Sequence, residues 1–476
     1  MAVDVIVVGA GLSGLVAGDR LQRAGLSVQV LEAAPRPGGV IGSERHGGVL
    51  FERGPNSGMD TSPAINTLLD DLGIRSQRLD ASKASSRRYV LRGGRLVALP
   101  MSGGSFLTTP LFSLGAKLRL FAEPFISRAP ADIEESIARF VRRRLGREFL
   151  DYAVEPFVSG IYAGDPEHLS VRAAFPRLHA LEQRYGSLLR GALLGARERR
   201  RKAEKSKSGA VSFSFRDGMQ TLTNALAAVL RDVQCGTRVV QLVRDPDGSY
   251  LVTVDRAGEA DHASSLRARA IVLAVPAHAG AALVRGLAPD AAESLDAIPY
   301  APVAVVVSAY RRPDVGHPLD GFGFLAPARE QPRVLGTLFS STMFEHRAPS
   351  ETVVFTSFLG GRRDPALVAA SDEELLQTVR TELERLVAAR GTPLFNEITR
   401  WPRAIPQYTI GHLQRIAQVE RADRELPGLY FCANYRGGVS ISDCITNGEA
   451  MAHTVSDYLA GARAKSPRGA GPAGID

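Results

Sequence analysis

The sequence predicts an α/β protein, α+β overall, in which a discontinuous Rossmann-like domain is interrupted by an antiparallel sheet and by a helical segment. A buried strand, a glycine turn, a helix and a second strand account for the first thirty-two residues. Strand-like sequence returns within residues 211–276, and a strand and a helix follow at 429–459. Between these parts, residues 100–205 read as mostly helical, and residues 303–358 read as strands of a second, mostly antiparallel sheet.

The glycine turn is the first element to justify. It has the GxGxxG spacing and consists of Gly9, Ala10, Gly11, Leu12, Ser13 and Gly14. The first glycine permits a tight turn, the second lets the backbone approach a pyrophosphate, and the third lets the helix pack closely on the strand. Glu32 ends the second strand about twenty residues later, where a carboxylate binds ribose hydroxyls and disfavours a 2′-phosphate. Together these features predict a dinucleotide site, whereas the glycines alone would also suit an ordinary tight turn.

Length and composition limit the class of protein. The chain has 476 residues, enough for two or three domains, and its 45% hydrophobic and 23% charged residues are typical of globular proteins. Three cysteines with no metal-ligand spacing argue against a disulfide framework and predict no metal site. No basic and apolar leader precedes the first strand, so we expect a cytoplasmic protein.

Two segments bear on membranes and on polyanions. The net charge of +8 includes a basic run from Arg197 to Lys207, which suits either a solvated loop or contact with anionic lipid. No nucleic-acid fold signature accompanies it, so we expect no nucleic-acid partner. The stretch from Leu96 to Ala116 carries no charge, but its prolines and glycines would break a spanning helix. With Phe121 and Phe125 nearby, it is either a core segment or an apolar surface that enters one leaflet, giving peripheral membrane association.

The organisation predicted from these segments has three domains and a tail. Residues 1–85, 211–276 and 401–461 form the discontinuous nucleotide-binding domain, and residues 86–99 and 277–400 form the antiparallel-sheet domain. Residues 100–210 form the helical domain, which is the one expected to associate with a membrane. Residues 462–476, rich in glycine, proline and alanine, are expected to be disordered. A nucleotide-binding domain that resumes near the end of the chain suits an FAD protein better than a simple nicotinamide dehydrogenase.

Longer motifs carry a family resemblance. The pattern Glu32-x-x-x-Arg36-x-Gly38-Gly39 and the segment 431–440 (FCANYRGGVS) resemble signatures of the amine oxidase and protoporphyrinogen oxidase flavoproteins. More specific likenesses to the protoporphyrinogen oxidase branch lie at residues 54–57, 157–166 and 321–325, and at Pro406-Gln407-Tyr408 with Gly411-His412. The resemblance extends over nearly the whole chain except the basic run and the tail. Val40 departs from it, because amine oxidases usually have an arginine there.

The resemblance implies an FAD cofactor, held noncovalently because no cysteine stands where a thioether to the flavin would form. It implies that the glycine turn and Glu32, with Ala33 beside it, hold the phosphates and ribose. It also implies that Val239 contacts the adenine through its backbone. The diphosphate and flavin would be lined by Arg36, Gly39, Val40, Gly54, Pro55, Asn56, Ser57, Trp401, Val439, Ser440 and Ile441. The last three would place a helix start at the flavin's pyrimidine end, where reduced flavin gathers negative charge. Asn56 is a candidate for orienting the reacting molecules, and no other catalytic residue is expected.

The resemblance further implies a tetrapyrrole substrate. An arginine opposite a propionate corresponds to Arg95, which from the residues alone would be a surface charge on a hairpin. The remaining substrate residues implied are Gly160, Ile161, Gly323, Leu325, Leu338 and Phe358, which alone would read mostly as sheet core. The function implied is the six-electron oxidation of protoporphyrinogen IX to protoporphyrin IX, in three flavin cycles with dioxygen as acceptor and hydrogen peroxide as product. Oxidation of coproporphyrinogen III, a flavin amine oxidase or carotenoid desaturase, and a flavin-free GDP-dissociation-inhibitor-like binding module stay open as alternatives, and so does a homodimer.

Overall fold

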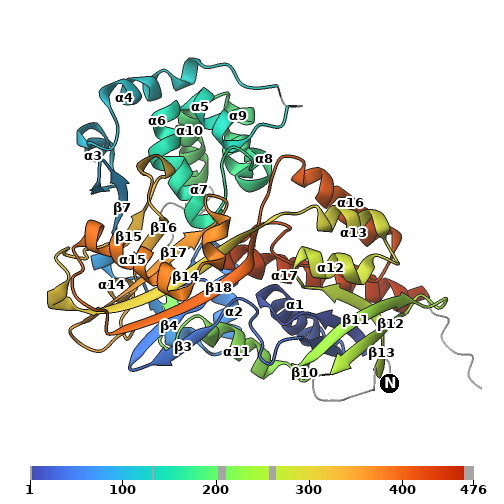
Figure 1. Cartoon of the computed structure of the whole chain (residues 1–476). Coiled ribbons are helices and arrows are strands. Elements are labelled where there is room, and N and C mark those ends of the chain that lie inside the picture. Colours follow the sequence, from blue (N-terminus) through green and yellow to red (C-terminus); the bar gives the residue numbers. More distant parts are fainter. Residues whose placement is uncertain (1–2, 131–132, 202–210, 257–263, 466–476) are drawn as a thin grey trace, which may run out of the picture.

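The first sheet is built around the N-terminal strand, as the sequence predicts. The computed structural model describes residues 3–130, 133–201, 211–256 and 264–465. Seven strands form the sheet in the order β10-β2-β1-β13-β12-β11, with β19 also on β13 (Figure 1). They are β1 (Val3–Val8), β2 (Val28–Leu31), β10 (Val233–Gln234), β11 (Thr237–Arg244), β12 (Tyr250–Arg256), β13 (Ser264–Leu273) and β19 (Leu429–Phe431). The strands β2, β1, β13 and β19 are parallel, so their apolar residues are covered on both faces by other elements.

Helices far apart in the sequence cover this sheet. One face packs against α1 (Leu12–Arg23), α2 (Pro63–Asp71), α11 (Gln220–Val229) and α17 (Ile441–Lys465). The other face packs against α12 (Ala277–Val284), α13 (Pro289–Asp296) and α16 (His412–Glu425). The α17 helix lies along α1, and a Cβ at Gly448 would stand 2.9 Å from the Ser13 carbonyl oxygen. The last helix therefore returns to the glycine turn at the start of the chain.

The second sheet has the order β18-β14-β17-β16-β15-β7-β8. Its strands are β7 (Arg87–Arg92), β8 (Arg95–Ala98), β14 (Tyr300–Arg311), β15 (Gly321–Leu325), β16 (Val334–Phe339), β17 (Thr352–Gly360) and β18 (Phe395–Pro406). All pairings are antiparallel except β15 with β7. One face is covered by α15 (Asp372–Val387), and the other faces the helical region and the loops of the first sheet. The short helix α14 (Ser340–Met343) follows β16, and two small sheets complete the fold: β3–β4 (Ser43–His46, Val49–Glu52) and β5-β9-β6 (Gly58–Met59, Ser212–Phe215, Arg78–Asp80). Phe213 and Phe215 of β9 belong to the core of the first sheet.

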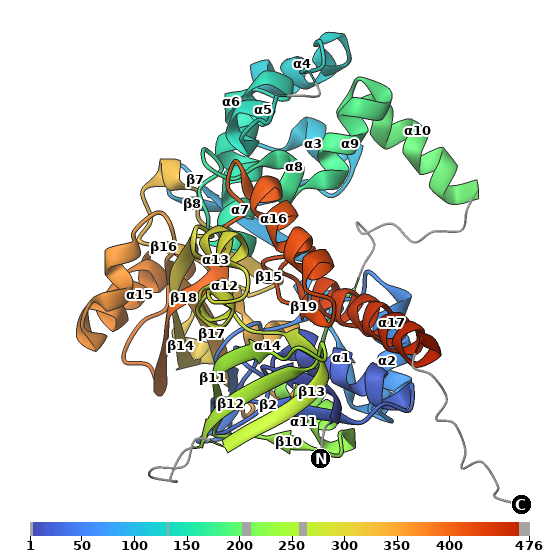
Figure 2. The ribbon, with the colours of Figure 1, turned by 90° about the vertical axis from the view of Figure 1, so that its right-hand side faces the viewer.

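The helical region stands beyond one end of the second sheet, at the top of Figure 1 and, turned by 90°, of Figure 2. It contains α3 (Gly103–Thr108), α4 (Leu114–Phe121), α5 (Ile137–Arg144), α6 (Arg147–Phe149), α7 (Glu155–Tyr162), α8 (Val171–Ala174), α9 (Pro176–Tyr185) and α10 (Leu188–Arg201). A π-helical turn, Leu150–Val154, links α6 to α7. Among the described residues, no helix is both long and apolar enough to span a bilayer.

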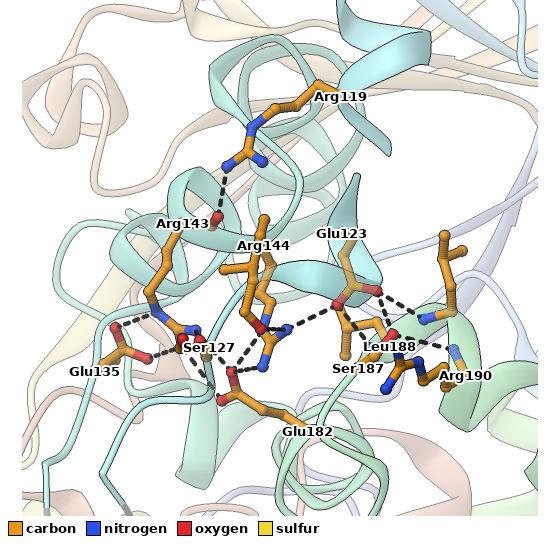
Figure 3. A network of polar contacts seen from close by, with 12 residues as sticks. Arg119, Glu123, Ser127, Glu135, Arg143, Arg144, Glu182, Ser187, Leu188 and Arg190 are labelled. Atoms are coloured by element: carbon orange, nitrogen blue, oxygen red, sulfur yellow. Dashed lines mark hydrogen bonds and ion pairs between the residues drawn. The ribbon is translucent and has the colours of Figure 1, made fainter. Parts of the chain in front are cut away.

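A buried ionic network holds this region together (Figure 3). The fully buried Arg144 guanidinium lies 3.1 Å from the Glu123 carboxylate and also pairs with Glu182. Glu123 in turn accepts hydrogen bonds from the backbone of Leu188 at 2.9 Å and Leu189 at 3.2 Å, which caps the start of α10. Because each buried charge has an opposite charge beside it, the network ties α5, α9 and α10 to the segment that follows α4.

Three predicted boundaries need correction. Strand β18 runs through residue 401, because its ladder with β14 extends from Phe395 to Pro406. The sequence assigns all of residues 277–400 to the second sheet's domain. The helices α12 and α13 instead pack on the first sheet, because their alanines and leucines join its core. Helix α17 reaches Lys465, into the predicted tail, where its alanines favour helix. The rest of the tail, and the basic run beyond Arg201, lie outside the described residues.

Candidate functional site

The glycine turn joins β1 to α1 with the geometry its motif predicts. Gly9 has a φ of +102°, and a Cβ there would stand 2.6 Å from the Ala274 carbonyl oxygen. A Cβ at Gly14 would stand 2.1 Å from the Gly9 carbonyl oxygen, whereas one at Gly11 would meet no described atom within 4 Å. Gly11 is also the residue before α1, and no side chain in the described part of the chain caps that helix. The two outer glycines are therefore required by packing, and the middle one leaves open space beside free helix N–H groups, as a phosphate requires.

Glu32 lies at the carboxyl end of β2, beside this turn. Its Oε2 accepts a 2.7 Å hydrogen bond from the Ala10 backbone N–H, and its Oε1 accepts one of 2.8 Å from Ala34. The Glu32 carbonyl oxygen accepts from Thr237 N, which brings the start of β11, and Val239 two residues on, to the same edge of the sheet. The carboxylate is thus fixed in place, and its remaining lone pairs can accept from ribose hydroxyls.

The loop that contains Arg36, Gly39 and Val40 folds back onto the glycine turn. Gly38 N donates a 2.8 Å bond to the Ala10 carbonyl oxygen, and a Cβ at Gly39 would stand 3.4 Å from the Gly11 Cα. The Arg36 guanidinium donates to the carbonyl oxygens of its own loop, at 2.8 Å to Ile41. Val40 is 43% exposed. This arginine therefore shapes the loop, and Gly38 and Gly39 hold the loop against the glycine turn.

The segment from Gly54 to Ser57 lies next to the loop that contains Val40, and the start of α17 lies beyond it. A Cβ at Gly54 would stand 2.1 Å from the Val40 carbonyl oxygen, and one at Gly58 would stand 3.4 Å from Ile441 Cγ2. The Ser442 hydroxyl donates a 2.6 Å hydrogen bond to the Met59 carbonyl oxygen, which fixes α17 to strand β5. Ser440 and Asp443 cap α17 reciprocally, each backbone N–H donating to the other's side chain at 3.2 Å. The structure therefore brings four predicted cofactor segments into one continuous row: the glycine turn, residues 32–40, residues 54–57 and the start of α17.

Trp401 stands where this row meets the second sheet. Its indole N–H donates a 2.7 Å bond to the Arg53 carbonyl oxygen, directly before Gly54. Trp401 is paired with Val303 in β14, and Val305 of the same strand is paired with Phe358. Because alternate residues of a strand share a face, Trp401 and Phe358 lie on one face of the sheet. Among the described residues, Asn56 makes one hydrogen-bond contact, 3.4 Å from its Nδ2 to the Gly54 carbonyl oxygen, which leaves its amide oxygen available beside this junction.

The predicted substrate residues line up on that same face. Phe358 is paired with Gly336, and Gly336 with Leu325, so these positions form one row across three strands. Leu338 is paired with Gly323 in the next row. The φ of Gly323 is +142°, and a Cβ there would stand 2.2 Å from the Thr337 carbonyl oxygen. The apolar row starts beside Trp401 and leads away from the cofactor segments toward the helical region.

Helix α7 faces this apolar row. A Cβ at Gly160 would stand 2.9 Å from Leu325 Cδ2, so any larger residue would displace the leucine. Ile161 is 37% exposed and Phe157 is 49% exposed, which leaves an apolar surface on the helix. Phe157 packs against Phe175 with their ring centroids 6.0 Å apart. The structure thus brings Gly160 and Leu325 into contact from two different regions of the chain.

Arg95 lies at the end of the β7–β8 hairpin, exposed, and opposite Arg92. Leu325 is paired with Val90 and Val90 with Val97, so both arginines follow on the face that bears Leu325. Arg92 is not among the residues singled out from the sequence. Its guanidinium stacks 4.3 Å from the Tyr152 ring centroid and pairs with Glu148, whereas Arg95 has no comparable partner among the described residues. No sequence signal distinguishes the two arginines, since both flank the same Gly-Gly turn.

Several known proteins resemble this chain over nearly its whole length. The model of the family described as flavin containing amine oxidoreductase matches residues 12–456. A mitochondrial protoporphyrinogen oxidase from Nicotiana tabacum is 31% identical, over 98% of this chain and 97% of that protein. A coproporphyrinogen III oxidase from Bacillus subtilis is 27% identical, over 96% of this chain and 98% of that protein. A crystal structure of a candidate protoporphyrinogen oxidase from Exiguobacterium sp. 255-15 superposes with a TM-score of 0.79 at 25% identity, covering 96% and 99% of the two chains.

Proposed function

We propose, because the chain belongs to the flavin-containing amine oxidoreductase family, that it oxidises protoporphyrinogen IX to protoporphyrin IX with dioxygen as the electron acceptor. Its cofactor is FAD, and it is an oxidoreductase. Each substrate molecule loses six electrons and six protons, and three dioxygen molecules are reduced to three molecules of hydrogen peroxide. The observation that carries the proposal is the apolar row of Leu325 and Phe358, which faces the glycine of α7 and begins at the cofactor end of the sheet.

The residues present suit the cofactor. The open space at Gly11 and the uncapped start of α1 would hold the pyrophosphate, and Glu32 would hold the adenosine ribose. The start of α17 would stand at the flavin's pyrimidine end, where its dipole favours negative charge. When bound, the flavin accepts a hydride from the substrate and passes the electrons to dioxygen.

The protein's own task is to bind, orient and exclude water. A flat apolar macrocycle would lie on the sheet face that bears Leu325, Leu338 and Phe358, with the exposed Ile161 of α7 at its edge. A side chain at Gly160 would displace Leu325 from this face, which accounts for glycine in α7 at a cost of about 1 kcal/mol. Arg95, with its charge unpaired among the described residues, would bind a propionate at the far end of the row. None of these substrate-facing residues is an acid or a base that could take part in the reaction.

Coproporphyrinogen III is the second candidate substrate, because a relative named for it aligns over almost the whole chain. That substrate carries two more carboxylates, which would need further cationic partners. Two more arginines share that face: Arg92, which is already paired with Glu148, and Arg88, which lies 5.4 Å from the Phe322 ring centroid and has no ion pair among the described residues. Protoporphyrinogen IX is the first candidate because a relative named for its oxidation is 31% identical, against 27% for the coproporphyrinogen III oxidase.

We also propose peripheral contact with a membrane through α4 and the turn after it. Leu114, Leu118 and Phe121 follow each other at helical spacing and are 72%, 60% and 60% exposed, and Phe125 is 84% exposed. Such a stripe is larger than isolated surface residues explain, and an apolar face beside Lys117 and Arg119 suits an anionic leaflet. In Figure 1, α4 lies at the outer edge of the helical region, away from both large sheets.

Anaerobic mixing tests the proposed reaction. Purified holoprotein mixed with protoporphyrinogen IX without oxygen should lose the absorbance of oxidised flavin, and should regain it when oxygen is admitted. Persistent flavin absorbance after mixing would refute protoporphyrinogen IX as the electron donor. Bleaching by coproporphyrinogen III alone would establish the second candidate instead.

A further inference from the structure

The residues from 406 to 412, which we call the connecting segment, have no role in the site so far. They join β18 to α16, carry no acidic or lysine or arginine side chain, and are mostly buried. Gln407, Tyr408 and His412 are 1%, 3% and 2% exposed. Buried polar side chains are expensive unless their hydrogen bonds are made, so the partners of these three residues indicate what the segment does.

Tyr408 fastens the turn that leads into α17. Its hydroxyl donates a 2.7 Å bond to the Asn434 carbonyl oxygen and accepts a 2.9 Å bond from Gly438 N. One oxygen atom thus holds both ends of the turn from Asn434 to Gly438. Burial raises the pKa of Tyr408 well above its usual value of 10, so the hydroxyl keeps its proton and can donate and accept at once. The residue after this turn is Val439, the first of the three residues assigned to the flavin.

His412 holds the same turn from a second direction. Its ring stacks on Tyr408, with centroids 4.2 Å apart and planes 12° from parallel. Its Nε2 stands 2.9 Å from the Tyr435 carbonyl oxygen. Burial lowers the pKa of His412 to about 4, so the ring is neutral near pH 7, and the bond requires the proton on Nε2. The stack and this bond keep Tyr408 and the turn in one fixed arrangement.

Gln407 points to the other side of the site. Its Nε2 donates a 2.7 Å bond to the Tyr162 carbonyl oxygen, at the last residue of α7, and a 3.0 Å bond to the Ile405 carbonyl oxygen. A Cβ at Gly164 would stand 2.6 Å from Gln407 Oε1, so the chain beyond α7 is packed closely against this amide. Gln407 therefore fixes the end of the helix that carries Gly160 and Ile161.

We propose that Tyr408 and Gln407 are adjacent positioning residues with separate tasks: Tyr408 sets the position of the α17 start against the flavin, and Gln407 sets the position of α7 against the substrate. The inference rests on the proposed function, because it takes Val439–Ile441 as flavin contacts and α7 as a substrate wall. Neither side chain needs to touch either molecule. The connecting segment would keep the two reactants in register, which hydride transfer between them demands.

Two variants separate the tasks. Tyr408→Phe removes the hydroxyl and keeps the ring, and Gln407→Met removes the amide and keeps the length. In holoprotein, Tyr408→Phe should lower the midpoint potential of bound flavin and alter its visible spectrum, because α17 loses its fixed position. Its affinity for protoporphyrin IX, measured by fluorescence titration, should stay within twofold of wild type. Gln407→Met should weaken protoporphyrin IX binding at least threefold and leave the flavin potential unchanged.

Tyr250→Phe is the matched control for a merely structural effect. Tyr250 is fully buried in β12, and its hydroxyl contacts two backbone carbonyl oxygens, Leu426 at 3.1 Å and Pro427 at 3.2 Å. Tyr250→Phe should lower the melting temperature without changing the flavin midpoint potential or the affinity for protoporphyrin IX. If Tyr408→Phe does not fold, His412→Gln provides the same measurement, since it breaks the stack and the bond to Tyr435 and should also lower the potential.

The outcomes are distinguishable. A wild-type potential and spectrum in both Tyr408→Phe and His412→Gln would overturn the role of Tyr408. Unchanged porphyrin affinity in Gln407→Met would overturn the role of Gln407. A wild-type protein that binds no porphyrin would refute both the Gln407 role and the proposed function, whereas a potential shift in Tyr408→Phe would still support the flavin half of the inference.

Discussion

Glu32 shows how one carboxylate can organise the start of the proposed cofactor site. It holds the backbone N–H groups of Ala10 and Ala34 and still has lone pairs free for a ribose. The sequence locates this acid through its distance from the glycines, but it does not show the two backbone bonds. Those bonds mean that Glu32 orders the turn before any cofactor arrives.

We expect Glu32→Ala to weaken FAD binding by about 1–3 kcal/mol, since one charge-assisted hydrogen bond to the ribose is lost. The measurement is a titration of apoprotein with FAD in which binding is monitored by the quenching of flavin fluorescence. Glu425→Ala is the control, because Glu425 is an exposed partner of Arg421 on α16. Undiminished affinity in Glu32→Ala would show that the ribose is held elsewhere.

The two hairpin arginines make a second prediction at this scale. Arg95→Ala should raise the KM for protoporphyrinogen IX more than it lowers kcat, because a propionate contact exists both before and during hydride transfer. Arg92→Ala should chiefly destabilise the hairpin, since Arg92 is paired with Glu148 and stacked on Tyr152. Steady-state kinetics and melting curves of both variants test this. A KM effect confined to Arg92→Ala would move the propionate site to that residue.

At the scale of elements, the register of the second sheet brings the proposed substrate residues together. Phe358 and Leu325 reach one row only because β16 places Gly336 between them. Phe358→Ala should slow flavin reduction by protoporphyrinogen IX in single-turnover mixing, because the macrocycle loses one wall. Reoxidation by dioxygen should stay near the wild-type rate, and Phe358→Leu should recover most of the reduction rate. Slower reoxidation with normal reduction would show that Phe358 is not a substrate wall.

The exposed stripe on α4 gives a further prediction for an element. A double variant with Asp at Phe121 and Phe125 should float less with anionic liposomes than the wild type does, because charge on that face opposes insertion. The buried network of Arg144 and Glu123 behind the stripe should keep the variant folded. Leu394→Asp is the control, since Leu394 is 60% exposed outside the helical region. Equal flotation of all three proteins would refute membrane contact through α4.

The elements also show what the sequence could predict. The strands β1, β14 and β17 can be predicted because their apolar residues form nearly continuous runs, and helix α15 because its apolar residues recur at helical spacing. Strand β18 cannot be predicted in this way, because its sequence FNEITRWPRAIP contains charged residues and two prolines. The strand lies at the edge of the sheet, where charges and prolines are tolerated. The pairing of β15 with the distant β7 depends on tertiary packing that no local pattern encodes.

At the scale of the whole molecule, the two large sheets meet where the cofactor row ends and the apolar row begins. Trp401 belongs to the second sheet and bonds to Arg53 beside the first. The connecting segment then ties α7 to the turn before α17. The sequence motifs single out the proposed cofactor residues directly, because glycines and an acid at fixed spacing have few other uses. They predict the substrate row only through resemblance, because leucine and phenylalanine on a strand are equally suited to a core.

The most direct test of the central claim compares both porphyrinogens on the purified holoprotein under air, with porphyrin fluorescence and oxygen consumption recorded together. We predict that protoporphyrinogen IX is converted to protoporphyrin IX with three dioxygen molecules consumed per porphyrin formed, and that coproporphyrinogen III reacts more slowly. Failure to form porphyrin from either substrate above its spontaneous oxidation, by protein that retains its FAD, would contradict the account.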